Sequence, residues 1–266
     1  MTENPKREEI LQNMKYSYSS VSGFFQCKLA FVYNYFYRVQ RAENIFAQIG
    51  TVSHEVMEEY MAGNIEVFEL EQYFRDKYAE KVTCSAPSML GQKFEESTIE
   101  KMTKFFSTTD FDRESYEILC MENKYEHVLD GDIKLVVKPD LIVRRKTDGK
   151  VILYDYKTSS YKKDSHAGYA KQCSLYKAIF EIVTGIHVDE MKILYFKETV
   201  KPRGKPLIYG RFIDLEYNEN ILEQFISDVK AIRAEKEWSA SPDEFFCNNL
   251  CSARIMCDVK EKVFGF

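Results

Sequence analysis

KPDLIVRRKTDGKVILYDYKTSS, residues 138–160, predicts two β-strands that are joined by a tight turn. The dipeptide Asp148-Gly149 is typical of hairpin turns, and runs rich in Val, Ile and Leu flank it on both sides. We therefore expect strands over about 140–145 and 151–157, paired antiparallel. This hairpin is the centre from which the rest of the chain is interpreted.

The hairpin brings two acids and a lysine to one place. Asp155 and Lys157 are two residues apart, so their side chains project from the same face of a strand. Asp140 follows Pro139 at the start of the first strand. Because the two open ends of a hairpin are adjacent in space, we expect Asp140 to approach Asp155 and Lys157.

This combination of side chains suits phosphodiester hydrolysis. Carboxylate oxygens are the ligands that Mg²⁺ or Mn²⁺ prefers, and such an ion activates water and neutralises charge on the phosphate. A lysine beside the ion can orient or deprotonate the attacking water, or stabilise the transition state. The alternative is a structural Asp–Lys pair on an exposed strand, which a bare D-x-K pattern does not exclude.

The remaining segments predict a mixed α/β core rather than a doubly wound sheet. We expect a single domain, 1–266, made of a helical part (about 1–110), a core (about 111–236) and an irregular Cys-rich tail (about 237–266). The predicted helices cover 16–41, a segment starting near Thr51 with Thr51 or Ser53 as cap, 66–108 with a break at 85–88, 166–184 and 219–236; further strands are predicted at 122–129, 133–137, 191–197 and 207–214.

Composition sets weak limits on partners and location. The net charge of −5 does not exclude nucleic acid, which responds to local charge such as the basic run from Lys192 to Arg211, including Lys197 and Lys205. Most basic runs are only solvated turns. Neither a secretory signal nor 18 consecutive apolar residues are found, so we expect a cytoplasmic protein without a membrane partner.

These motifs together resemble the PD-(D/E)XK superfamily, specifically its RecB-like branch. The resemblance covers nearly the whole chain, although each motif alone is weak. The matching segments are Pro139-Asp140 for PD, Asp155-Tyr156-Lys157 for (D/E)-x-K, Gly50-Thr-Val-Ser-His54 for G-x-x-x-H, Gln172-Cys-Ser-Leu-Tyr176 for Q-x-x-x-Y, and Ser17 to Cys27 for the segment that leads into a cysteine.

The resemblance implies a restriction-endonuclease-like core, with a mixed central sheet flanked by helices. It assigns catalysis to Asp140, Asp155, Lys157, Gln172 and Tyr176, and metal binding to His54, Asp140, Asp155 and the carbonyl of Tyr156. A neutral imidazole can ligate a divalent metal. Glu126 is a weak candidate for a further carboxylate, and a solvated glutamate is the alternative there.

Cysteines gather near the C-terminus as Cys247-x3-Cys251-x5-Cys257. With Cys27 they resemble the ligands of the cluster-bearing RecB-like nucleases, AddB and the CRISPR-associated exonucleases, which implies a [4Fe–4S] cluster. Those proteins usually have C-x2-C where this chain has C-x3-C, so zinc stays an alternative, as does simple burial of thiols. Cys84, Cys120 and Cys173 lack such spacing and are interpreted as core or incidental residues.

The resulting hypothesis is a DNA exonuclease that works from single-stranded or duplex ends in repair or recombination. The chain has no Walker-type phosphate loop, so unwinding would come from a helicase or recombination partner. A structure- or sequence-selective endonuclease is the second hypothesis. The third is a non-catalytic DNA-end-binding protein, which would have no need of Asp140, Asp155 and Lys157.

Overall fold

The computed structural model describes residues 5–109, 111–201, 203–204 and 207–259. Lys205 of the basic run lies outside the described residues, as do the first four residues of the predicted helical part and residues 260–266 of the predicted tail.

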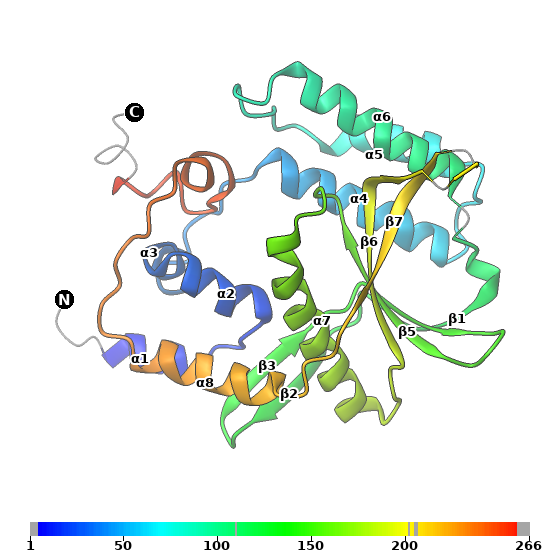
Figure 1. Cartoon of the computed structure of the whole chain (residues 1–266). Coiled ribbons are helices and arrows are strands. Elements are labelled where there is room, and N and C mark those ends of the chain that lie inside the picture. The colour runs from blue at the N-terminus through cyan, green and yellow to red at the C-terminus, as the bar shows by residue number, and fades with distance from the viewer. Residues whose placement is uncertain (1–4, 110, 202, 205–206, 260–266) are drawn as a thin grey trace.

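A five-stranded mixed sheet forms the centre of the molecule, in the order β1-β4-β5-β6-β7 (Figure 1). All neighbouring strands are antiparallel except β5 and β6. A separate hairpin, β2-β3, makes a second, two-stranded sheet. The strands are β1 (Tyr116–Met121), β2 (Tyr125–Leu129), β3 (Ile133–Val137), β4 (Leu141–Arg145), β5 (Val151–Lys157), β6 (Glu190–Val200) and β7 (Ile208–Leu215).

Helices cover both faces of this sheet (Figure 1). Single turns of π-helix follow α3, as η1 (Val32–Phe36), and occur in the tail, as η3 (Phe246–Leu250), and a 3₁₀ turn, η2 (Arg113–Ser115), precedes β1. The α-helices are α1 (Pro5–Asn13), α2 (Tyr18–Gln26), α3 (Lys28–Phe31), α4 (Ile45–Met61), α5 (Leu70–Lys81), α6 (Gln92–Thr108), α7 (Lys163–Thr184) and α8 (Ile221–Ala234).

Strand β5 is central, and alternate side chains enter different cores. Tyr154 and Tyr156 pack with α4, α5 and α6, whereas Leu153 packs with α7 and Ile193 of β6. A strand with helices on both faces is expected to be apolar throughout, as the sequence VILY is. Helix α7 is also the crossover that lets β6 run parallel to β5. The polar residues at the end of β5 therefore lie at a buried position.

The segment that follows α8 runs beside α2 and α3 (Figure 1). The N–H of Leu29 donates to Ser239 O at 3.2 Å, and the N–H of Ala42 donates to Ser252 O at 2.8 Å. Trp238 packs against Phe24 and Phe31 in a core shared with α8. The C-terminal segment is thus packed on the N-terminal helices rather than on the central sheet.

The predicted fold class is confirmed, but several predicted boundaries differ. The predicted helix 16–41 is interrupted at Cys27, whose backbone is extended, and its helical part ends at Phe36.

Helix α4 begins at Ile45 because the Asn44 side chain accepts the N–H of Ala47 at 2.9 Å, a strong N-cap. The predicted caps Thr51 and Ser53 lie inside the helix, where their hydroxyls donate to carbonyls four residues earlier.

The predicted strand 122–129 is a further error. It begins only at Tyr125 as β2, and the preceding strand β1, in a different sheet, ends at Met121. A polar turn between them, Glu122-Asn123-Lys124, was taken for strand.

Within the described residues, none of the helices has the length and apolar character that crossing a membrane would need.

Candidate active site

Strand pairing places Asp140 against the end of β5. Leu141 pairs with Tyr154, so Asp140 lies one position beyond, where the hairpin opens. Its Oδ2 accepts the N–H of Tyr156 at 2.7 Å, and its main-chain carbonyl accepts the N–H of Glu122 at 3.1 Å. These two bonds hold Asp140 between β5 and the end of β1. The expected approach of Asp140 to β5 is therefore present.

Asp155 and Lys157 form a buried pair on the α7 side of β5. The Asp155 side chain is 1% exposed, and Lys157 Nζ lies 2.6 Å from its Oδ2. Among the described residues, neither carboxylate oxygen accepts a well-aligned hydrogen bond, so this contact is an ion pair. Burial lowers the pKa of Lys157, but the charges of Asp155 and Asp140 outweigh it and raise that pKa above its ordinary value.

Helix α4 presents His54 to the same place. Its Nε2 lies 3.2 Å from the Tyr156 carbonyl oxygen, and its Nδ1 lies 3.4 Å from Glu122 Oε1 and 3.6 Å from Asp140 Oδ1. Burial lowers the pKa of His54, yet the charge of Asp140 and the contact with Glu122 raise it to about 9. The imidazole thus faces two carboxylates and a carbonyl oxygen, and all three are groups that bind cations.

Glu122 completes this group and was missed by the sequence analysis. It follows the last residue of β1 and has a positive φ of 54°, an uncommon conformation for a residue that is not glycine. Its side chain is 15% exposed and also pairs with Lys138. The polar triplet after the apolar strand ILCM was the available signal, because a strand end at Met121 puts Glu122 at the sheet edge.

Glu126, the weak candidate for a further carboxylate, lies elsewhere. It belongs to the β2-β3 hairpin, where its Oε1 pairs with Lys15 Nζ at 2.6 Å and half of its side chain is exposed. The solvated alternative is the one the structure supports. The sequence prediction failed for Glu126 because it lies on β2, which belongs to a separate sheet from the strands of the site.

The residues fit a divalent cation. One ligand atom each from His54, Glu122 and Asp140 lie within 4.8 Å of one another. Burial and the charge of Asp155 raise the pKa of Asp140 to about 7, so the acids repel one another when all are ionised. Asp155, which pairs with Lys157, lies outside this group of three among the described residues. Hard carboxylate oxygens with one imidazole and a carbonyl suit Mg²⁺ or Mn²⁺.

Comparison with known proteins agrees with this geometry. A family model described as the PD-(D/E)XK nuclease superfamily matches residues 15–258. The chain belongs to the PD-(D/E)XK nuclease superfamily. The match includes strands β4 and β5 and helices α4 and α7.

Other comparisons add little. No curated protein gives a significant match. A solved structure titled "Crystal structure of SSO0001" is similar at 15% identity, covering 95% of this chain and 92% of that chain, with a TM-score of 0.39. Such a distant likeness says nothing of substrate or mode of cleavage.

Gln172 and Tyr176 lie on α7, beside the catalytic hairpin of this PD-(D/E)XK chain. Gln172 Nε2 donates to Tyr176 Oη at 2.7 Å. Burial raises the pKa of the Tyr176 phenol, as does the charge of Asp155. Within the described chain both side chains bond to each other and not to Lys157. Their predicted catalytic role stays a prediction.

The four predicted cluster cysteines lie where the C-terminal segment packs on α2 and α3, but among the described residues no three of their sulfur atoms lie within 4.8 Å of one another. Cys27 ends α2, and Cys251 follows the π-helical turn that holds Cys247. Burial raises the pKa of Cys251, and so do the charges of Cys27, Cys247 and Cys257, despite an opposing hydrogen bond from Ala253. Cys120 and Cys173 are core residues, as expected, and Cys84 is half-buried.

Proposed function

We propose that this chain is a metal-dependent DNA exonuclease of the RecB-like branch, with a structural [4Fe–4S] cluster. The observation that carries the nuclease part is the convergence of Asp140, Glu122 and His54 beside the Asp155–Lys157 pair. Among the described residues, Asp155 pairs with Lys157 and Glu122 pairs with Lys138. A divalent ion would supply further positive charge between Asp140, Glu122 and His54.

In this proposal the ion is held by His54, Glu122, Asp140 and Asp155, with the Tyr156 carbonyl. When bound, a divalent ion lowers the pKa of water and neutralises charge that builds on the phosphate. The chain's own contribution is positional. Asp155 holds the Lys157 ammonium at 2.6 Å, so that its remaining N–H donors can face a phosphate oxygen or the attacking water.

Cleavage from ends, rather than within the strand, rests on the resemblance to the single-domain, cluster-bearing relatives. The same resemblance supports the cluster, together with the proximity of Cys27, Cys247 and Cys257 to Cys251. A helicase or recombination partner, which would unwind duplex for such an enzyme, is part of the same proposal. Four thiolates on two chain ends suit a cluster that ties those ends together.

The test uses labelled linear single-stranded, linear duplex and closed circular DNA with Mg²⁺ or Mn²⁺. We expect degradation of linear DNA only, and we expect Asp155→Ala to abolish it while DNA binding is retained. Glu126→Gln is the matched control, because it removes an acid on the exposed hairpin and should leave activity unchanged.

Each other outcome contradicts part of the proposal. Cutting of circles shows an endonuclease, and binding without cutting by the unaltered protein shows the non-catalytic alternative. Hydrolysis that persists in Asp155→Ala shows that the site is wrong.

A further inference from the structure

A cavity of about 540 Å³ opens directly beside the end of the catalytic strand. Thr158, Ser159 and Ser160, which follow Lys157, form part of its wall. Lys197, near the C-terminal end of β6, forms another part. Because β5 and β6 are parallel, this is the end of the strand pair where ligands bind in open α/β sheets.

One side of the cavity is aromatic. Phe46 of α4 meets Phe94 of α6 edge-on, with ring centroids 5.4 Å apart, and Phe245 of the C-terminal segment at 6.3 Å. Three separate segments of the chain thus contribute one phenyl ring each. Such a wall offers flat apolar surface that a planar ring can stack on.

The rest of the lining is basic and rich in hydroxyls. Besides Thr158 to Ser160, it includes Ser165, Lys162 and Lys197, and among the described residues that line the cavity there is no Asp or Glu. That is unusual in a chain with a net charge of −5. Hydroxyls and ammonium groups are common partners of phosphate oxygens.

Lys197 carries a poorly compensated charge. Its Nζ lies 5.3 Å from the centroid of the Phe94 ring. Burial, and then the charge of Lys101, lower its pKa to about 8, and Glu198 opposes them only weakly. The Glu198 carboxylate instead accepts the N–H of Tyr161 at 2.9 Å. An anion in the cavity would supply the missing partner.

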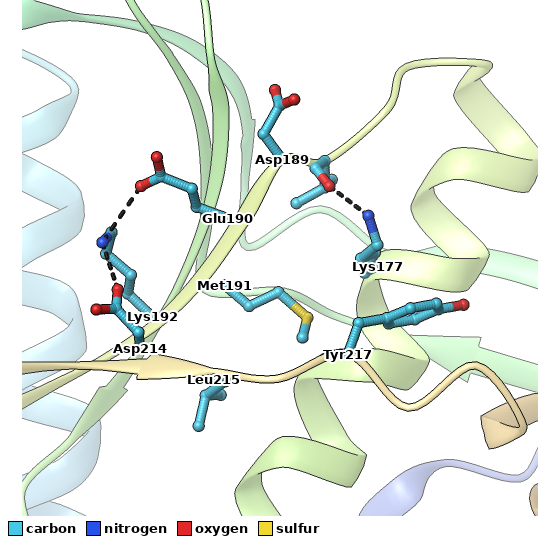
Figure 2. Close-up of a pocket in the computed structure, with 9 residues that line it drawn as sticks. Lys177, Asp189, Glu190, Met191, Lys192, Asp214, Leu215 and Tyr217 are labelled. Atoms are coloured by element: carbon cyan, nitrogen blue, oxygen red, sulfur yellow. Dashed lines mark hydrogen bonds and ion pairs between the residues drawn. The ribbon is translucent and has the colours of Figure 1, made fainter.

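A second hollow, of about 410 Å³, lacks these properties (Figure 2). It lies at the start of β6, at the opposite end of the strand from Lys197. Three acids line it, and its cations are already bonded: Lys192 pairs with Glu190 and Asp214, and Lys177 donates to Val188 O. It therefore offers no site for an anionic ligand.

We propose that the cavity beside β5 binds one unpaired nucleotide next to the scissile phosphate, with its base against Phe94 and its phosphate near Lys197. The proposal rests on the proposed nuclease function and deepens it. A paired base cannot leave its stack to enter the cavity without losing its partner, so the enzyme acts on single-stranded DNA, or on ends with unpaired nucleotides. Among the linear substrates, a blunt duplex is then degraded more slowly than a single strand.

The first measurement is binding, which needs no catalysis. Asp155→Asn protein is mixed in Mg²⁺ with a single-stranded oligonucleotide that holds the fluorescent base 2-aminopurine at one position per strand. We expect quenching at one position, where the base stacks. Adding Phe94→Ala should remove the quenching, and adding Phe68→Ala should not, because Phe68 is an exposed ring that does not line the cavity.

The second measurement is kcat/KM on single strands with one abasic residue. Because stacking on an aromatic ring contributes substantially to binding of each base, we expect about a tenfold loss at one position for the unaltered protein. In Phe94→Ala the abasic and normal strands should be cleaved equally. Lys197→Gln should lower kcat/KM about tenfold, and Lys192→Gln, on the same strand but in the other hollow, should not.

The outcomes separate the two proposals. Cleavage with no abasic effect at any position, or an abasic effect that survives both Phe94→Ala and Lys197→Gln, overturns the cavity proposal and leaves the nuclease intact. Quenching without cleavage supports the cavity and contradicts the nuclease. If the melting curve shows that Phe94→Ala does not fold, the effect of Lys197→Gln on kcat/KM decides whether the cavity binds the nucleotide.

Discussion

At the scale of single residues, the site combines side chains that oppose folding. Burial and the charge of Asp155 raise the pKa of Asp140, and the charges of His54 and Lys157 offset this only in part. Such groups lower the stability of the folded protein where no cation is bound, and they favour the binding of a cation. Activity and stability are therefore expected to trade off here.

Asp140→Asn should separate the two effects. Asparagine still accepts the N–H of Tyr156 but carries no charge, so at pH 8 without metal the variant should unfold a few degrees higher than the wild type. Mn²⁺ should raise the melting temperature of the wild type by roughly 5 °C and that of the variant much less. Thermal melts with and without Mn²⁺ measure both, with Glu126→Gln as control.

The stability of the metal-free protein is expected to fall as the pH rises. The pKa of Asp140 is about 7 in the folded protein and ~3.9 in an unfolded chain, so the folded state binds the proton more tightly. Protonated Asp140 therefore favours the folded state below pH ~4, and this contribution, on the order of 4 kcal/mol, is lost as the pH rises to about 7. The metal-free wild type should lose stability relative to Asp140→Asn over this range. A variant that is less stable at pH 8 would contradict the charge account.

At the scale of elements, the ends of strands decided what the site contains. The alternation in β5 was readable in the sequence, because Asp155 and Lys157 share a face at any register. The polar triplet after β1 could have marked the end of that strand, but the direction of the Glu122 side chain could not be predicted, because it depends on a positive φ at the strand terminus. Local propensity does not encode that conformation for a glutamate, which the bond to Asp140 O and the Lys138 contact hold in place.

Glycine in β7 sets the packing of α6 on the sheet. Gly210 has φ of 86°, and a Cβ there would lie 2.6 Å from the Phe105 ring of α6. Gly210→Ala should therefore destabilise the protein by about 2–4 kcal/mol, as overpacking and backbone strain combine. Gly23→Ala is the matched control, since nothing lies within 4 Å of its added Cβ, and it should gain up to about 1 kcal/mol. Urea unfolding of both variants measures these changes in the free energy of unfolding, and equal changes in the two variants would contradict the prediction.

At the scale of the whole molecule, the two ends of the chain are joined beside the catalytic core. The segment with the late cysteines bonds to Leu29 and Ala42 and also supplies Phe245 to the cavity beside β5. A cluster on Cys27, Cys247, Cys251 and Cys257 would hold that wall in place. It would act on substrate binding without taking part in the chemistry.

Cys251→Ser should show this dependence. Protein purified without oxygen is expected to be brown and to contain iron, and the variant should lose both. Its amide protons at Leu29 and Ala42 should then exchange faster, because their acceptors Ser239 and Ser252 lie on the released segment. Cys84→Ser should change neither colour nor exchange. Colourless wild type with stoichiometric zinc would replace the cluster with a zinc site.

What the sequence determined by itself was local: the hairpin, the shared face of Asp155 and Lys157, and the motif order typical of a PD-(D/E)XK nuclease. These follow from strand periodicity and turn chemistry, which act over a few residues. Tertiary structure alone decided that Glu122 rather than Glu126 joins His54 and Asp140, and that Phe46, Phe94 and Phe245 share one cavity. The reason is physical: those residues are far apart in the chain, and only burial of the common core brings them together.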